Sequence, residues 1–130
     1  MGYRSDVALA LSHAAALKLH ELVKVTEDRD KTSLVRMPER HVVDEATGHE
    51  IFYWEYMKWY DDDRTDEAYK DVCFVADFID SLESSEYLFC RVGEDTDDTE
   101  IRGEFWSNPF DLGIVRRIEF SNPNTHDAGN

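Results

Sequence analysis

The sequence predicts an α+β fold: a mainly antiparallel sheet of five to six strands with two helices on one face, in the order β-α-β-β-α-β-β-β. Apolar and aromatic segments of strand length are interrupted by only two segments with helical spacing of apolar residues. Short turns separate neighbouring strands, which favours antiparallel pairing. No repeat or Gly/Ser/Pro linker divides the 130 residues. We therefore expect one domain over residues 1–120 and a frayed tail over residues 121–130.

The first strand and the first helix follow each other directly. The run Val7–Leu11 is wholly apolar, as is typical of a buried strand. Ser12 suits the N-cap of a helix over His13–Val25, because its hydroxyl can accept a hydrogen bond from a free backbone N–H of the first turn. The apolar side chains of this helix fall on one stripe, which faces the core. The stripe consists of Ala15, Leu19, Leu22 and Val23.

A β-hairpin is expected next. A weak strand pattern covers Leu34–Val43, and Asp44–Gly48 suits a hairpin loop because Gly48 can adopt a positive φ. The segment Ile51–Tyr60 is almost entirely aromatic or β-favouring and gives the strongest strand signal in the chain.

The second helix is expected to begin after Thr65, a good N-cap, and to end near Leu82. Asp66 and Glu67 fall in its first turn, where the helix dipole favours anions. Its apolar stripe has the spacing of a helix packed on a sheet. The stripe consists of Ala68, Val72, Val75, Ile79 and Leu82.

Three strands complete the predicted sheet. Tyr87–Val92 and Ile101–Phe105 are joined by the acidic turn Gly93–Glu100, and Gly113–Phe120 forms the last strand.

The chain carries 29 acidic and 14 basic residues and has a formal net charge of −15. Phosphate backbones and anionic lipids repel such a surface, which argues against direct binding to nucleic acid or membrane. No apolar run is long enough to span a bilayer. Aromatic residues make up 12%, which argues against an acidic disordered chain. Cys73 and Cys90 are too few for a disulfide scaffold, so we expect a cytoplasmic protein.

Most of the negative charge lies between Tyr60 and Glu100. This segment contains fifteen acidic residues and three basic residues. One interpretation is a solvated face that keeps a small aromatic-rich protein in solution. The other is a surface that imitates nucleic-acid phosphates and blocks the basic groove of a nucleic-acid-binding protein. The predicted charge providers are Asp61, Asp62, Asp63, Asp66, Asp77, Asp80, Asp95, Asp97 and Asp98.

The aromatic strand has large rings on both of its expected faces. Strict alternation places Trp54 and Tyr56 on one face and Tyr53 and Trp59 on the other. The helices can cover only one face, and exposed contiguous aromatic area usually marks an interface. The sequence thus leaves an alternative open, in which the protein is a self-associating structural or adaptor domain. It would form a homodimer through Trp54 and Tyr56, and its acidic residues would serve solubility.

No motif for a metal, a cofactor or a nucleophile is found. The five histidines lack the spacing of a zinc ligand set, and Asp95–Glu100 lacks the glycine and the closing Glu of a calcium loop. No phosphate-binding glycine loop or nucleophile elbow occurs. An acid–base enzyme would need a carboxylate in an apolar setting, for which Glu55 is the best candidate and Arg91 a possible ion-pair partner. We expect no cofactor and assign no catalytic residue.

The opening residues, Met1-Gly2-Tyr3-Arg4-Ser5-Asp6-Val7, resemble the start of short, uncharacterised phage and prophage proteins. This resemblance covers about seven residues and includes no catalytic motif. It implies a small accessory protein of the bacterial cytoplasm. Such proteins include anti-restriction and anti-CRISPR inhibitors, several of which are acidic mimics of nucleic acid. It carries over no binding residue.

Overall fold

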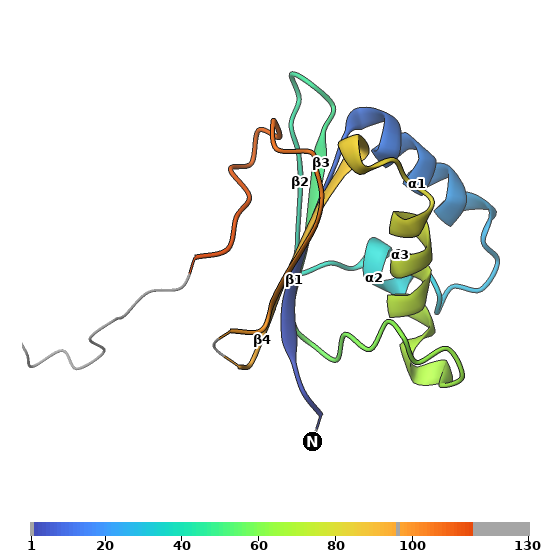
Figure 1. Ribbon diagram of the computed structural model, residues 1–130. Coiled ribbons are helices and arrows are strands. Elements are labelled where there is room, and N and C mark those ends of the chain that lie inside the picture. The colour runs from blue at the N-terminus through green and yellow to red at the C-terminus, as the bar shows by residue number, and fades with distance from the viewer. Residues whose placement is uncertain (1, 96, 116–130) are drawn as a thin grey trace, which may run out of the picture.

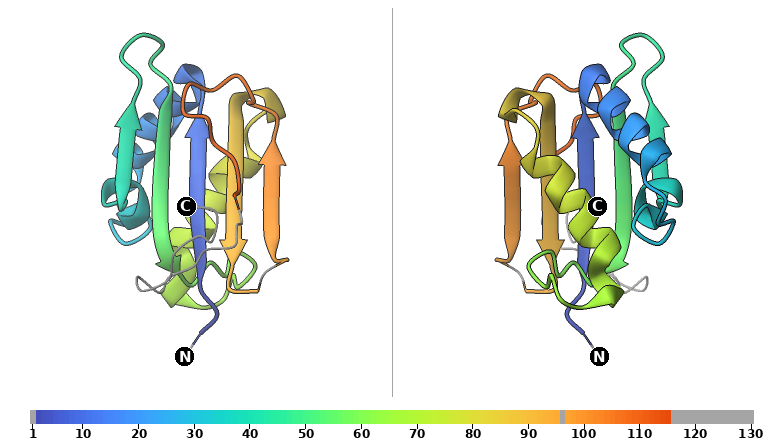
Figure 2. Two further views of the ribbon diagram at one scale, coloured as in Figure 1. Left: turned by 90° about the vertical axis from the view of Figure 1, so that its left-hand side faces the viewer. Right: turned by 90° about the vertical axis from the view of Figure 1, so that its right-hand side faces the viewer.

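The computed structural model describes residues 2–95 and 97–115. These form one five-stranded antiparallel sheet with the strand order β2-β3-β1-β4-β5 (Figures 1 and 2). The predicted α+β class is therefore confirmed. The elements are β1 (Ser5–Leu11), α1 (His13–Val25), α2 (Ser33–Arg36), β2 (Arg40–Val43), β3 (Glu50–Met57), the 3₁₀ turn η1 (Glu67–Tyr69), α3 (Lys70–Asp80), the 3₁₀ turn η2 (Ser84–Glu86), β4 (Tyr87–Gly93) and β5 (Thr99–Gly103).

The three helices all cover the same face of the sheet, and the segment after β5 runs over the opposite face (Figure 1). We call these the helix face and the open face. The cross-strand register assigns each side chain to a face, because side chains alternate along a strand. Because the helices lie on one side only, they leave the open face to be covered by other segments.

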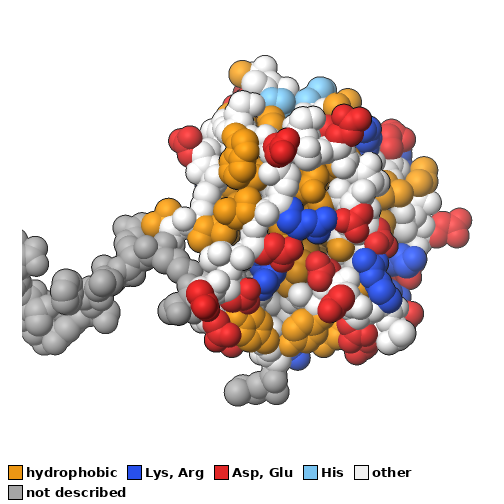
Figure 3. All heavy atoms as spheres, viewed as in Figure 1, with side chains coloured by type: hydrophobic (Ala, Val, Ile, Leu, Met, Phe, Trp, Pro, Cys, Tyr) orange, Lys and Arg blue, Asp and Glu red, His pale blue; other side chains and the backbone are white. Residues whose placement is uncertain are grey.

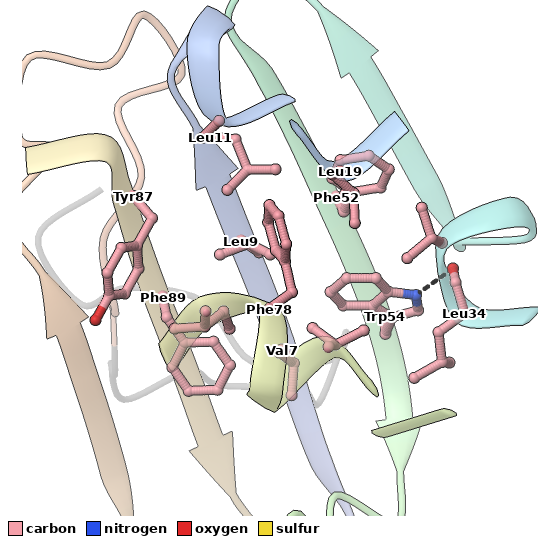
Figure 4. Packing of buried hydrophobic residues seen from close by; sticks show 14 of the residues in the cluster. Val7, Leu9, Leu11, Leu19, Leu34, Phe52, Trp54, Phe78, Tyr87 and Phe89 are labelled. Carbon is pink, nitrogen blue, oxygen red and sulfur yellow. Dashed lines mark hydrogen bonds between the residues drawn. The ribbon is translucent and has the colours of Figure 1, made fainter. Parts of the chain in front are cut away.

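The central strand β1 is apolar on both sides, with large residues on one and small residues on the other. Val7, Leu9 and Leu11 point to the helix face and are at most 1% exposed. Ala8 and Ala10 point to the open face. Figure 4 shows Val7, Leu9 and Leu11 in the core between the sheet and the helices.

Helix α1 confirms its predicted limits and its cap. The Ser12 hydroxyl accepts a hydrogen bond from the Ala15 backbone N–H at 3.2 Å, which satisfies one of the free donors of the first turn. Ala15 and Leu19 are buried as expected. Leu22 remains 37% exposed, so the buried stripe is narrower than predicted.

The prediction of a strand over Leu34–Val43 was wrong for the first half of this segment. Residues Ser33–Arg36 form α2, and the strand begins only at Arg40. Leu34 is buried, and its carbonyl accepts the indole N–H of Trp54 at 2.9 Å (Figure 4). A buried indole N–H requires a partner, and the carbonyl of this short helix provides it.

The second helix begins slightly later than predicted. Asp66, not Thr65, caps the 3₁₀ turn η1 by accepting the Ala68 backbone N–H at 2.9 Å, and α3 follows at Lys70. Val72, Val75 and Ile79 are buried in the core as predicted. An aspartate is as good a cap as a threonine, so composition alone did not distinguish the two neighbours.

A β-bulge in β3 changes the expected faces of the aromatic strand. The β1–β3 register shifts between the pairs Val7–Trp54 and Ser5–Met57, so that one extra residue is inserted. At the bulge Tyr56 adopts φ of 56°, and its backbone N–H donates to Asp6 Oδ1 at 2.9 Å. After the bulge the alternation of side chains between the two faces is reversed. The Trp59 side chain therefore lies in the core, where it is 7% exposed.

The expectation that Trp54 and Tyr56 share an exposed face was therefore wrong. Trp54 is 2% exposed and lies against the rings of Phe52 and Trp59, whereas Tyr56 is 65% exposed. The Tyr56 ring lies under the Arg4 guanidinium, 4.9 Å from its centroid. A prediction based on strict alternation cannot anticipate a one-residue insertion.

The last predicted strand, Gly113–Phe120, lies mostly outside the described residues, as does the predicted tail 121–130. The part that is described, residues 113–115, is not in a strand.

The bulge leads to a testable difference between the two aromatic residues. Trp54→Ala should lower the free energy of unfolding by about 3–5 kcal/mol, because it removes a large buried side chain. Tyr56→Ala should cost less than about 1 kcal/mol, because the ring is mostly exposed. Urea denaturation of both variants measures the difference. Equal losses would contradict the reversed alternation.

Candidate functional site

Two acidic loops lie at the same end of the sheet. One is the connection from β3 to α3 and the other is the turn from β4 to β5 (Figure 1). We call this region the acidic end, and it consists of Asp61, Asp62, Asp63, Asp66, Glu94, Asp95, Asp97, Asp98 and Glu100.

Tyr3 holds the two loops together. Its backbone N–H donates to the Tyr60 hydroxyl at 2.8 Å, and its own hydroxyl donates to Asp98 Oδ2 at 2.7 Å. The same hydroxyl accepts the Asp95 backbone N–H at 2.9 Å. The N-terminal segment thus fixes the acidic loops relative to each other, although α3 and β4 separate them in sequence.

Arg91 holds the β4–β5 turn in place through hydrogen bonds to its acidic residues. Its guanidinium donates to both Asp98 oxygens at 2.8 and 3.1 Å and to Glu100 Oε1 at 3.0 Å. It also donates to the Ser5 hydroxyl at 3.0 Å. The hydrogen bonds that Arg91 donates to Asp98 and Glu100 raise the pKa of Arg91 above its ordinary value. Asp98 is therefore a structural anchor of the turn, and Arg91 does not pair with Glu55 as the sequence allowed.

Three of the predicted charge providers, Asp77, Asp80 and Asp98, form ion pairs with arginines of the described residues. Asp77 binds Arg64 at 2.6 Å, Asp80 binds Arg102 at 2.6 Å, and Asp98 binds Arg91. Asp77 and Asp80 lie along α3, where Asp80 is about 15 Å from Lys70 along the helix axis. Asp80 therefore lies away from the acidic end, whereas Asp77 is bound to Arg64 of the β3–α3 loop.

The exposed members of the acidic end include Asp62, Asp66, Asp95 and Asp97. Within the described ranges, no ion pair joins Asp62 or Asp97 to a basic side chain. Over the face shown in Figure 3, acidic side chains are mixed with Lys and Arg, so the negative potential is uneven.

Asp61 differs from its neighbours in its surroundings. Burial raises the pKa of its carboxyl group, and the nearby carboxylates of Glu100 and Asp62 raise it further. Arg102 partly opposes this effect. The folded protein therefore favours the protonated form of Asp61 more than the unfolded chain does.

A second polar cluster, which the sequence did not predict, joins α1 to the β2–β3 hairpin. Glu50 is 7% exposed, and both of its oxygens contact imidazoles. His20 Nε2 lies 2.9 and 3.0 Å from the two oxygens, and His41 Nε2 lies 2.7 Å from Oε1. The His41 ring also stacks on Phe52 with 4.3 Å between centroids.

This cluster has the character of a satisfied buried acid. An ionised carboxylate only accepts hydrogen bonds, and an imidazole that carries a proton on Nε2 can donate one to it. The sequence does not indicate the cluster, because His20 lies on α1, far along the chain from His41 and Glu50, and meets them only when α1 packs beside the β2–β3 hairpin. In residues 2–95 and 97–115, no group of three or more His, Cys, Asp or Glu side chains could hold a metal ion.

Other candidate chemistry is not supported by the geometry. Glu55 is exposed, so it lacks the apolar surroundings that an acid–base role requires. Cys73 and Cys90 are both buried, and burial raises the pKa of each thiol, which makes the thiolate nucleophile less accessible. Among the described residues, no helix is long and apolar enough to cross a membrane.

The fold and the surface define an α+β protein whose acids gather at one end of a five-stranded sheet. Comparison of the chain with protein-family models, with curated proteins and with solved structures found no match.

The environment of Asp61 predicts a pH-dependent gain in stability. A raised pKa in the folded state means that ionisation of Asp61 opposes folding, so this cost appears as the pH rises through the raised value. Asp61→Asn should leave stability unchanged below the unfolded pKa and increase it at neutral pH. Chemical denaturation of both proteins across this pH range measures the change. A loss of stability at neutral pH would contradict the proposed environment.

The buried carboxylate predicts a non-additive pair of substitutions. His41→Phe keeps the stacking on Phe52 but removes one donor to Glu50, and should cost about 1–3 kcal/mol of stability. Adding Glu50→Met removes the buried acceptor as well and should restore much of the loss. A double-mutant cycle from urea denaturation tests this. Strict additivity would show that Glu50 does not depend on His41.

Proposed function

We propose that this protein is a non-enzymatic inhibitor of the phage type, which acts in the bacterial cytoplasm. Its acidic end occupies the basic groove of a host nucleic-acid-binding protein and thereby keeps nucleic acid out. The single observation that carries this proposal is the gathering of acids from two separate loops at one end of the sheet.

The arrangement of these loops supports a preformed surface. Tyr3 and Arg91 fix the loops through hydrogen bonds, so little ordering would be needed on binding. Each of the two loops also presents an exposed carboxylate: Asp62 lies in the β3–α3 loop and Asp97 in the β4–β5 turn. Duplex DNA presents about one charge per 1.7 Å of its axis, so a cluster of this kind resembles a short stretch of it.

The net charge supports the same kind of partner. With a charge of −15 the protein attracts basic surfaces over distances near the Debye length and repels phosphates. Attraction of this kind acts mainly on the association rate. A partner with a Lys/Arg-lined groove therefore fits better than a nucleic acid or a membrane.

The proposal is tested by neutralising the exposed acids without disturbing the anchors. The protein is immobilised, and a bacterial host lysate is passed over it at low salt. We expect capture of one dominant nucleic-acid-binding protein, which a short DNA duplex then releases. The double variant Asp62→Asn/Asp97→Asn should release this partner at lower salt and slow its association by roughly three- to tenfold.

A matched control has the same net charge. Glu21→Gln/Glu27→Gln neutralises two exposed acids on and just after α1, away from the acidic end. It should behave as the unmodified protein does. If both double variants weaken binding equally, or if DNA fails to release the partner, the acidic end is not a mimic of nucleic acid.

A further inference from the structure

The strand β5 forms one edge of the sheet, and no segment of the described residues pairs with its outer side (Figure 2). On its inner side β5 pairs with β4 along its whole length, from Thr99 to Gly103. A free edge presents unpaired backbone N–H and C=O groups that can bond to another strand. The outer side of β5 is therefore a template for a further strand.

The ladder with β4 determines which backbone groups of β5 are free. The Gly93 N–H donates to the Asp98 carbonyl at 2.9 Å, so these two residues form a hydrogen-bonded pair. Bonded and non-bonded pairs alternate along an antiparallel ladder. Every second residue from Asp98 therefore directs its backbone groups towards β4, and those of Thr99, Ile101 and Gly103 point to the free edge.

The side chains of β5 divide between the two faces of the sheet. The register with β4 places Ile101 on the open face, where it is 51% exposed. Glu100 and Arg102 point to the helix face. Glu100 accepts a hydrogen bond from Arg91 through Oε1 alone, at 3.0 Å, and Arg102 donates to Asp80 through Nη2 alone, at 2.6 Å. Within the described residues, each thus keeps bonding groups for a neighbouring strand.

Charge selects one way in which two copies of β5 can pair. Antiparallel copies bond through their outward residues, so the registers that pair most of the strand place a two-fold axis at Glu100, Ile101 or Arg102. An axis at Glu100 or at Arg102 brings two like charges directly opposite each other, which is destabilising. An axis at Ile101 instead brings each Glu100 opposite the partner's Arg102. It also bonds all three outward residues, so the strand is complementary to itself in this register.

The end of β5 fits the same register. Gly103 has φ of +89°, and a Cβ there would collide with the Tyr87 carbonyl, so glycine allows the chain to turn sharply. The Glu104 backbone N–H then donates to the Ser84 carbonyl at 2.7 Å. A longer strand would place Glu104 in the ladder opposite the partner's Asp98, and the turn prevents this pairing of like charges.

We propose that two copies of this chain associate through β5, in antiparallel register about a two-fold axis at Ile101, and form one continuous sheet. The Ile101 side chains of the two copies meet on the open face. Each Glu100 lies opposite the partner's Arg102 on the helix face. The two acidic ends lie at opposite ends of the joined sheet. This interface does not depend on the function proposed above.

The other edge of the sheet, β2, lacks this property. Its residues Arg40–Val43 carry a single permanent charge, so charge selects no register there. A second copy also fits β5 better than an unrelated strand does, because the same five residues supply both sides of a complementary ladder. Two-fold pairing of this kind is the commonest form of self-association.

Sedimentation of the full chain tests the association itself. The measurement is made in about 0.3 M salt, which screens the repulsion between two chains of net charge −15. We expect a monomer–dimer equilibrium at protein concentrations up to roughly 1 mM, because a small interface binds weakly. A monomer throughout this range would overturn the proposal. An assembly larger than a dimer would do so too, because a two-fold contact closes on itself.

Two substitutions at the axis test the edge. Ile101→Pro removes a backbone donor that faces solvent in the single chain, a position where an edge strand tolerates proline. It should weaken the dimer at least about tenfold and leave the circular dichroism unchanged, whereas Val43→Pro at the edge of β2 should leave the dimer intact. Ile101→Lys brings two like charges together at an exposed position, so it tests the edge even if the proline variant does not fold. Equal effects at Ile101 and Val43 would overturn the proposal.

Disulfide formation tests the register. In the bonded pair at the axis, the Cα atoms of the two residues 101 lie about 5.5 Å apart, within the range of a disulfide. Ile101→Cys should therefore give a cross-linked dimer under mild oxidation. Thr99→Cys should not, because the two residues 99 lie about 14 Å apart along the strands in this register. Faster cross-linking of Thr99→Cys, or of Val43→Cys at the other edge, would overturn the proposal.

Discussion

The rest of the structure depends on the central strand β1 and the division of its side chains by size. Val7, Leu9 and Leu11 fill the space below the helices, and the two alanines between them leave the opposite face shallow. The strand is hydrogen-bonded to neighbours on both sides, so any slip in register would move the large residues to the wrong face. The thick core on the helix face and the small side chains on the open face thus have the same origin in sequence.

Local signals in the sequence predicted most elements of the fold. The Ser12 cap, the limits of α1 and the strand β4 need only information from adjacent residues, and the structure places them where the sequence does. The wrong predictions have a different cause. Leu34 belongs to a short helix because its carbonyl meets the indole of Trp54, which is twenty residues away in sequence. Propensity cannot detect a contact of that kind.

The β-bulge shows the same limit for the candidate site. The alternation of residues predicts a face correctly only while the strand remains regular, and the extra residue at Tyr56 reverses it. Asp6 stabilises the bulge from another strand, so its cause is not contained in Ile51–Tyr60 itself. Likewise, composition predicted where acids are dense along the chain but not which of them Arg64, Arg91 and Arg102 neutralise. The Glu50 cluster joins His20 of α1 to His41 and Glu50 of the β2–β3 hairpin, and composition gave no signal for this contact.

The N-terminal segment has a practical consequence for anyone who handles this protein. Tyr3 lies between the two acidic loops and bonds to both, so the polypeptide enters the fold at the acidic end itself (Figure 1). An affinity tag fused ahead of Gly2 would emerge among these carboxylates. A basic or histidine-rich tag would screen them and could suppress an interaction that the untagged chain makes. The placement of a tag is therefore a chemical variable for this protein rather than a matter of convenience.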